Sequence, residues 1–135
     1  MKTRVLDSWA ILEWMNGRRP ADTFVAAQLA EGEAGKARLL MSAINVSEVY
    51  CFLQKRHSAA LADSWRESSG TFPVTIEVPT LDDIWQAASL QGLFPISYAG
   101  AFAAALSQKH NCALVTGDPE FRSVDKLKLD WIGRG

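Results

Sequence analysis

The sequence contains few of the residues that build disulfide frameworks or metal–sulfur sites. Of its 135 residues, only two are cysteines, Cys51 and Cys112, and only two are histidines. The two cysteines lie apart in apolar stretches and have neither a disulfide-framework pattern nor a zinc-binding spacing. A Gly-rich phosphate-binding loop is also missing, and no serine has a histidine partner at a readable spacing. These absences argue against zinc chemistry, dinucleotide binding and a serine nucleophile.

The chain also lacks a large net charge and long apolar runs. Its 14 Lys and Arg residues nearly balance its 15 Asp and Glu residues, which leaves a net charge of −1. Any contact with nucleic acid must therefore come from a local patch rather than from bulk positive charge. No apolar run approaches the length of a membrane span, and no segment has the pattern of a signal peptide. We therefore expect no membrane association and a cytoplasmic location.

The residues that are present predict one compact α/β domain spanning residues 1–135. Hydrophobic residues make up 48% and charged residues 21%, which is typical of a folded chain with a sizeable core. Short strands are predicted at residues 3–6, 39–44, 72–78, 112–116 and 126–132. Helices are predicted at residues 8–16, 21–38, 58–69 and 98–109, and from Val46 and Leu81 onward. This alternation favours a mainly parallel central sheet of four to five short strands flanked by helices, a three-layer sandwich.

Acidic residues follow three of the predicted strands. Asp7 follows the first strand, Glu48 lies one helical turn past the second, and Asp118 follows the strand that ends near Thr116. Because the carboxyl ends of parallel strands share one edge of a sheet, the three carboxylates can converge there. Converging carboxylates repel each other unless a cation neutralises them, and hard oxygen ligands suit Mg²⁺ or Mn²⁺. This arrangement is suited to phosphodiester hydrolysis by an activated water.

Each of the three acids, taken alone, also fits an ordinary helix cap. Asp7 can cap the first helix, and Asn45 with Glu48 fits a capping box. Asp118 is followed by a proline, the usual residue at a first helical position. Both explanations stay open for each residue, but their joint occurrence at three strand ends favours a site.

Four short motifs follow one another along nearly the whole chain: Val5–Ser8, Asn45–Val49, Ile96–Leu106 and Leu114–Phe121. In this order they resemble the motifs of PIN-domain ribonucleases, above all the VapC-type toxins of bacterial and archaeal toxin–antitoxin pairs. The resemblance implies a PIN-like fold and a Mg²⁺-dependent endoribonuclease, with Mn²⁺ as an alternative metal. It implies that Asp7, Glu48 and Asp118 form an acidic, metal-binding cluster, which the hydroxyl groups of Ser8 and Thr116 support. The implied partners are an RNA substrate, a small antitoxin protein and a second copy of the chain.

The sequence departs from this resemblance at Gly100, where the family has an aspartate as a further catalytic and metal-binding acid. With Ser97 as the N-cap, Gly100 takes the third helical position, where a capping box favours an acid and a glycine costs about 1 kcal/mol. A substituted aspartate or a close backbone contact explains this glycine. The substitution leaves a second function open, that of a catalytically silent PIN-like module that binds antitoxin or RNA. A phosphoacceptor receiver domain fits less well, because only Asp7 follows the first strand.

The remaining candidates lie outside the acidic cluster. Arg122 is the preferred RNA contact, because it lies four residues beyond Asp118. Among the five tryptophans, Trp85 and Trp131 fit core stripes, whereas Trp9 and Trp14 fit a surface that contacts the antitoxin or a second copy.

Overall fold

The structure is a computed structural model, and it describes residues 1–134. The strands are β1 (Lys2–Leu6), β2 (Ala37–Ser42), β3 (Thr75–Glu77), β4 (Ala113–Thr116) and β5 (Leu129–Trp131). The helices are α1 (Ser8–Met15), α2 (Ala21–Glu33), α3 (Ala43–Arg56), α4 (Ala59–Ser68), α5 (Leu81–Leu93) and α6 (Tyr98–Lys109), with the 3-10 helix η1 (Pro119–Ser123) after β4. The predicted alternation of strands and helices is confirmed.

All five strands belong to one parallel sheet in the order β3-β2-β1-β4-β5. The strand order reverses between β1 and β4, so chain segments far apart in sequence lie side by side at the centre of the sheet. In open parallel sheets, ligands bind beyond the carboxyl ends of the strands at such a switch point. The predicted three-layer α/β sandwich is confirmed, and this edge is the place to look for a site.

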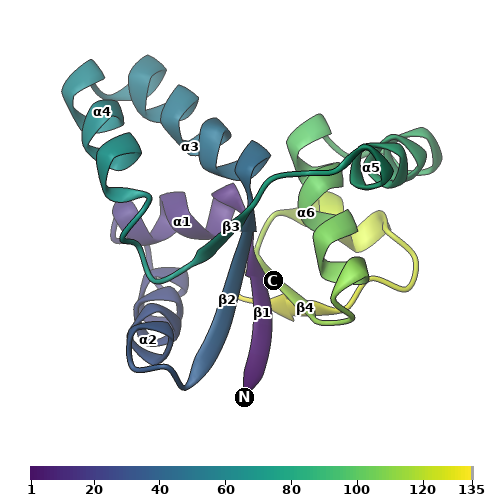
Figure 1. Ribbon diagram of the computed structural model, residues 1–135, viewed down its shortest axis with the longest axis horizontal. Coiled ribbons are helices and arrows are strands. Elements are labelled where there is room, and N and C mark those ends of the chain that lie inside the picture. The colour runs from purple at the N-terminus through teal and green to yellow at the C-terminus, as the bar shows by residue number, and fades with distance from the viewer. Residues whose placement is uncertain (135) are drawn as a thin grey trace.

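Helices cover both faces of the sheet, with α1 to α4 on one side and α5 and α6 on the other (Figure 1). The alternation of side chains along β1 explains this division, because Leu6 packs with the first group and Val5 with the second. The central strands β2, β1 and β4 are mostly buried, as in other parallel sheets covered by crossover helices, whereas the edge strands β3 and β5 are not.

The boundary between β2 and α3 differs from the prediction. The strand ends at Ser42, whose hydroxyl oxygen caps α3 by accepting a hydrogen bond from the amide of Ile44. Asn45 is therefore not the N-cap, and Glu48 is not at the third helical position. The helix begins earlier because Ser42 is itself a good cap residue directly after the strand. Glu48 consequently lies in the second turn of α3.

The two apolar helices α5 and α6 lie at different depths. Nine residues of α6 are buried, from Ala99 to Ser107, whereas α5 exposes Leu81, Ile84, Trp85 and Leu93. The prediction that Trp85 lies in the core is therefore wrong, since 66% of it is exposed. Within residues 1–134, no single helix is long and apolar enough to cross a membrane; α5 and α6 would pass together by length and composition, but the chain bends by 116° between them.

Candidate active site

The register of β1 and β4 brings Asp7 beside Thr116. Leu6 pairs with Val115, so the next residues, Asp7 after β1 and Thr116 at the end of β4, are neighbours. Asp7 is only 3% exposed. Its Oδ1 accepts a hydrogen bond from the amide of Ala10 at 2.9 Å, and its Oδ2 accepts one from the hydroxyl of Thr116 at 2.6 Å. Asp7 thus caps α1, as the sequence suggested, and also points into the switch point of the sheet.

Thr116 links Asp7 to the second strand-end acid. Its hydroxyl oxygen accepts a hydrogen bond from the amide of Asp118 at 3.0 Å while it donates to Asp7. Asp118 is half-buried, and its Oδ1 accepts a hydrogen bond from the amide of Glu120 at 3.1 Å, which caps η1. The two strand ends are therefore joined through one hydroxyl group.

Glu48 reaches the same edge of the sheet from α3. Its Oε1 accepts a hydrogen bond from the hydroxyl of Ser8, the first residue of α1. Ser8 is buried and Glu48 is half-buried. The two predicted supporting hydroxyls therefore each hold one acid, Ser8 holding Glu48 and Thr116 holding Asp7.

The charges of these three acids act on each other. The pKa of the Asp7 carboxyl is raised from an ordinary 3.8 to about 7, chiefly because the group is buried. The hydrogen bonds from Thr116 and Ala10 lower this pKa, and the negative charges of Asp118 and Glu48 contribute to its rise. The three predicted acids are therefore close enough to interact, although they are far apart in sequence.

The fourth predicted position, Gly100, lies in the first turn of α6 beside a carboxylate that comes from η1. Ser97 caps α6, as predicted, by accepting a hydrogen bond from the amide of Gly100 at 3.0 Å. The carboxylate of Glu120 accepts hydrogen bonds from the Ser97 amide at 2.6 Å and from its hydroxyl at 2.9 Å. Sequence reasoning missed Glu120, although it lies in the fourth motif, because its partner Ser97 is 23 residues away.

Asn45 connects α3 to the same turn of α6. Its side chain is buried, and its Nδ2 donates a hydrogen bond to the carbonyl oxygen of Ala99 at 3.1 Å. Its Oδ1 is buried and has no hydrogen-bond partner among residues 1–134. The role of Asn45 is therefore to hold the start of α6, and not to cap α3.

The acidic cluster has the ligand atoms that a hard divalent cation prefers, but its side chains are not arranged around a preformed cation site. Within the described residues, no three His, Cys, Asp or Glu side chains are arranged so that they could hold a metal ion. The oxygen atoms of Asp7, Glu48 and Asp118 are nevertheless the type that Mg²⁺ and Mn²⁺ prefer. A cation would also offset the mutual repulsion that raises the pKa of Asp7.

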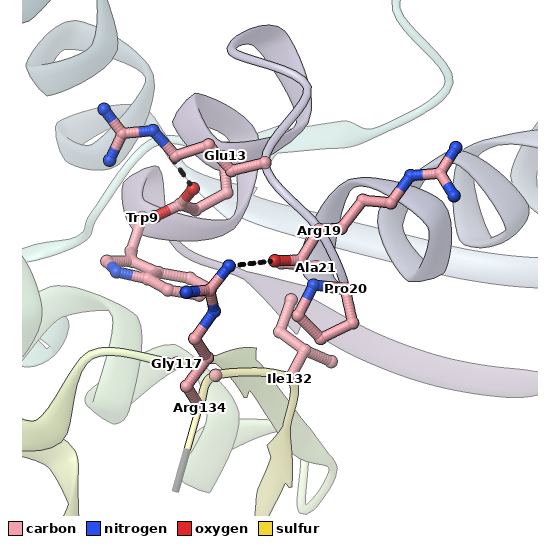
Figure 2. Close-up of a pocket in the computed structure, with 10 residues that line it drawn as sticks. Trp9, Glu13, Arg19, Pro20, Ala21, Gly117, Ile132 and Arg134 are labelled. Atoms are coloured by element: carbon pink, nitrogen blue, oxygen red, sulfur yellow. Dashed lines mark hydrogen bonds and ion pairs between the residues drawn. The ribbon is translucent and has the colours of Figure 1, made fainter.

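A pocket of about 410 Å³ borders the end of β4 (Figure 2). Trp9, Gly117 and Ile132 form its apolar wall. Its charged lining consists of three arginines, Arg18, Arg19 and Arg134, and of Glu13, whose carboxylate lies 3.8 Å from the Arg18 side chain. A Cβ atom on Gly117 would lie 2.5 Å from the Cα of Gly133, so only glycine fits where the two chain segments meet.

The predicted RNA contact, Arg122, stacks against an aromatic ring at the far end of η1. Its guanidinium carbon lies 4.0 Å from the centroid of the Trp131 ring. This is a cation–π distance, so Trp131, which is half-buried, has a cationic neighbour rather than the purely apolar surroundings of a core stripe.

The three-dimensional arrangement matches solved structures of toxin–antitoxin proteins. A structure of VapBC2 from Rickettsia felis bound to a DNA fragment from its promoter has a TM-score of 0.73 and 16% identity, over 95% of this chain and 97% of that chain. VapC20 from Mycobacterium tuberculosis, described as a sarcin-ricin loop cleaving toxin, has a TM-score of 0.72 and 16% identity, over 88% and 92% of the two chains. VapBC-1 from nontypeable Haemophilus influenzae has a TM-score of 0.70 and 19% identity, over 96% and 97%.

At these identities the structures show a shared fold, and the family follows from the sequence match. No curated protein sequence gives a significant match. The model of the PIN domain family matches residues 4–127, which is most of the chain and contains all four motifs. This chain belongs to the PIN domain family.

Proposed function

We propose that this protein is a Mg²⁺-dependent endoribonuclease and the toxin of a type II toxin–antitoxin pair in the cytoplasm. The observation that carries the proposal is the convergence of Asp7, Glu48 and Asp118 at the switch point of the sheet, where burial and, to a smaller extent, the charges of Asp118 and Glu48 raise the pKa of Asp7. A buried carboxyl with charged neighbours in such a place is typical of a functional site. Membership of the PIN family and the shared fold with VapC20 support a nuclease that acts on structured RNA.

In this proposal Asp7, Glu48 and Asp118 hold the metal, which supplies an activated water and charge neutralisation at the phosphate. Thr116 orients Asp7, and Ser8 orients Glu48. Burial of Asp7 keeps bulk water from its two oxygens, so its orientation depends on the protein alone. Three acids from different elements are thereby fixed by the sheet and by two hydroxyl groups.

The pocket beside β4 has an excess of positive charge close to the acidic cluster. Arg18, Arg19 and Arg134 line it next to Gly117, the residue before Asp118, and Glu13 is the acid among its lining residues. Arginines in this position can bind RNA phosphates on one side of the scissile bond, and Arg122 can do so on another. Since phosphate contacts release counterions, such binding should weaken as salt concentration rises.

The test is cleavage of structured RNA by the purified chain with Mg²⁺, with Mn²⁺ and with EDTA. We expect cleavage only with a divalent cation, and the Asp7→Asn variant should lose it while its circular dichroism is unchanged. Asparagine keeps the size and the capping oxygen of Asp7 but removes the anionic ligand. Cleavage by Asp7→Asn at the wild-type rate would remove Asp7 from the mechanism.

A second candidate function rests on Gly100. If the glycine removes an essential acid, the chain is a silent PIN-like module that binds antitoxin or RNA without cleaving. The two functions separate in one experiment, because the silent module binds RNA in a gel-shift assay but leaves it intact at every Mg²⁺ and Mn²⁺ concentration.

We also propose two protein partners, an antitoxin and a second copy of the chain. The VapBC complexes among the similar structures support the antitoxin. The exposed apolar side chains of Leu81, Trp85 and Leu93 on α5 support a homodimer. Trp85→Lys should convert the dimer to a monomer in light scattering, whereas Glu31→Lys on the exposed side of α2 should not. A wild-type monomer at high concentration would exclude the homodimer.

A further inference from the structure

The pocket at the end of β4 brings an aromatic ring and a carboxylate together on one face of α1 (Figure 2). Trp9 and Glu13 lie four residues apart on this helix, a spacing that makes their side chains neighbours. Trp14, the other tryptophan of α1, is not part of the pocket lining and packs against Phe72, with ring centroids 5.7 Å apart. Of these two tryptophans, Trp9 is therefore the one placed to contact a ligand in the pocket.

The carboxylate of Glu13 is mostly buried, and its hydrogen-bonding capacity is not used. Its side chain is 17% exposed, and its Oε2 is buried without a hydrogen-bond partner among residues 1–134. Arg18 is the cation paired with it, but 3.8 Å between Arg18 Nε and this oxygen is longer than a hydrogen bond. The Arg18 side chain is 69% exposed, so it can turn outward and leave the carboxylate to another donor. Because a buried oxygen without a partner costs free energy, a ligand that donates to it removes this cost.

The same pocket carries three arginines with exposed side chains, Arg18, Arg19 and Arg134. Arg134 Nη2 donates a hydrogen bond to the carbonyl oxygen of Arg19 at 3.1 Å, which joins the segment after β5 to the segment before α2. The pocket thus combines an acceptor for N–H groups, an aromatic surface for stacking and donors for phosphate oxygens. A ligand that carries only negative charge fits this set poorly, because Glu13 repels it.

The size and the place of the pocket fit one nucleotide of a bound RNA. Its volume of about 410 Å³ is near the lower end of the range of about 300–1,000 Å³ for small-ligand pockets. Two of its lining residues are also close in sequence to the acidic cluster, since Trp9 follows Asp7 by two residues and Gly117 directly precedes Asp118. An RNA with a phosphate at the acidic cluster therefore brings the base of a neighbouring nucleotide to this pocket.

From this set of groups we propose that the pocket is a base-recognition site, which holds a guanine of the RNA next to the phosphate that is cut. The base stacks on Trp9, and its N1–H and 2-amino groups donate hydrogen bonds to the Glu13 carboxylate. The arginines bind the adjoining phosphates. Guanine fits because adenine and cytosine present an acceptor nitrogen at the corresponding edge, and uracil has a single N–H donor there. This inference rests on the proposed action on RNA and adds the base that is recognised beside the cut.

The experiment measures RNA binding by fluorescence anisotropy in EDTA, so that metal-dependent cleavage does not interfere. The probes are three fluorescein-labelled RNA pentamers of adenosine, with adenosine, guanosine or inosine at the central position. The wild type should bind the guanosine pentamer at least about tenfold more tightly than the adenosine pentamer, the effect of one good bidentate contact to a base. The inosine pentamer, which lacks the 2-amino group, should fall between them. Equal binding of all three pentamers would overturn the inference.

Glu13→Gln is the variant that tests the base contact. It replaces one acceptor oxygen by an amide donor, so it should reduce the preference for guanosine to about twofold or less. Glu33→Gln is the matched control, because it removes the same charge from the exposed last residue of α2, outside the pocket lining. This control should keep the preference of the wild type. A preference that persists in Glu13→Gln, or that is lost in both variants, contradicts the role of Glu13.

Trp9→Leu tests the stacking surface, with Trp14→Leu as the control on the same helix. Stacking on an aromatic ring is a large part of the binding of single-stranded RNA, so Trp9→Leu should weaken binding of the guanosine pentamer about fivefold or more. Trp14→Leu should lower the melting temperature, because it removes the contact with Phe72, and should bind the pentamer like the wild type. Equal losses of affinity in the two variants would mean that stability and not stacking is responsible. If Trp9→Leu does not fold, Glu13→Gln decides the inference.

An acidic segment of a protein partner is the competing occupant of the pocket. The probe for it is a fluorescein-labelled peptide of six glutamates. If this peptide binds the wild type, binds Glu13→Gln more tightly, and the three RNA pentamers bind equally, the pocket holds a protein segment and the inference fails.

Failure of this inference and failure of the proposed nuclease are distinguishable, because binding is measured without cleavage. If the preference for guanosine is as expected but no RNA is cleaved with Mg²⁺ or Mn²⁺, the pocket keeps its role and the nuclease proposal fails. If RNA is cleaved but the three pentamers bind equally, the nuclease proposal stands and the guanine site does not. A wild-type chain that binds none of the three pentamers also overturns the guanine site.

Discussion

Asp7 and Asp118 follow neighbouring parallel strands and both cap the next element, but they differ in their exposure to solvent. Asp7 is 3% exposed and gives both oxygens to hydrogen bonds within the protein. Asp118 is half-buried, and its Oδ1 accepts a hydrogen bond from the amide of Glu120 in η1. The same rule of helix capping thus places one acid inside the domain and the other at its rim.

The difference shows where capping stops being a sufficient explanation. A cap needs only an oxygen that accepts a hydrogen bond, which Ser or Asn supplies without a charge. At Asp7 the cap is a buried carboxyl, whose pKa rises to about 7, so its charged form destabilises the fold. An uncharged cap residue would avoid this destabilisation, so capping alone does not explain an aspartate here, and we infer a role for its negative charge. At the rim, where burial costs less, an acid at a cap carries no such information.

The largest effect expected from this comparison is on the pH dependence of stability without divalent cations. Below pH 3.8 the Asp7 carboxyl is neutral in both the folded and the unfolded chain. Between pH 3.8 and 7 the unfolded chain releases the proton that the folded chain keeps, so the free energy of unfolding falls as pH rises. Above pH 7 the charged Asp7 lowers the free energy of unfolding by its full amount, about 4 kcal/mol. Asp7→Asn should therefore be more stable than the wild type at pH 8 and similar at pH 4.

Urea unfolding in EDTA at both pH values tests this prediction, with Asp118→Asn as the matched variant at the rim. At pH 8 only Asp7→Asn should have a higher free energy of unfolding than the wild type. Mg²⁺ should reduce this difference, because it stabilises the wild type. Equal gains from both variants would mean that the two acids are equivalent and that burial does not set Asp7 apart.

The sequence alone could predict this edge of the sheet because its signals are local. Strand-length apolar runs followed by Asp7 and Asp118 mark two strand ends, and the parallel topology brings them together. The same local reasoning assigned the cap of α3 to Asn45, since both Ser42 and Asn45 are cap residues and only the end of β2 decides between them.

The parts of the site that the sequence did not predict depend on contacts between distant segments. The hydrogen bond from Ser97 to Glu120 joins the cap of α6 to η1, and no periodicity or motif spacing in the sequence predicts it. The prediction that Trp85 is buried is wrong for a related reason. An apolar stripe on a helix predicts a face that packs against other apolar groups, but the stripe of α5 leaves Trp85 exposed in this chain.

A smaller effect is expected from Thr116→Val, which keeps the shape but removes the hydroxyl between the two acids. The substitution removes the bond to Asp7 and leaves the amide of Asp118 without this partner. We expect a loss of about 2–3 kcal/mol at pH 8, where Asp7 is charged, and a smaller loss at pH 5. The pKa of Asp7 should rise further, so the pH profile of cleavage should move to higher pH.

Thr75→Val on the exposed strand β3 is the control for the loss of a threonine hydroxyl in the sheet. It should leave both the stability and the pH profile close to those of the wild type. An unmoved profile in Thr116→Val would show that the hydroxyl packs beside Asp7 without setting its charge.

The smallest effect is expected from Ser8→Ala, because the carboxylate that Ser8 holds is the more exposed one. Its hydroxyl donates to Glu48, which is half-buried and can turn to water when the bond is lost. Alanine also favours the helix slightly more than serine does, so the net loss of stability should be about 1 kcal/mol or less. The rate of cleavage should fall by more than this small loss of stability explains, because Glu48 loses the group that orients it.

Ser47→Ala is the matched variant, because Ser47 is the residue before Glu48 and its hydroxyl donates a hydrogen bond to the carbonyl oxygen of Ile44 instead of to an acid. Cleavage that falls in Ser8→Ala but not in Ser47→Ala assigns the orienting role to Ser8; equal rates in the two variants would leave Glu48 positioned by α3 alone.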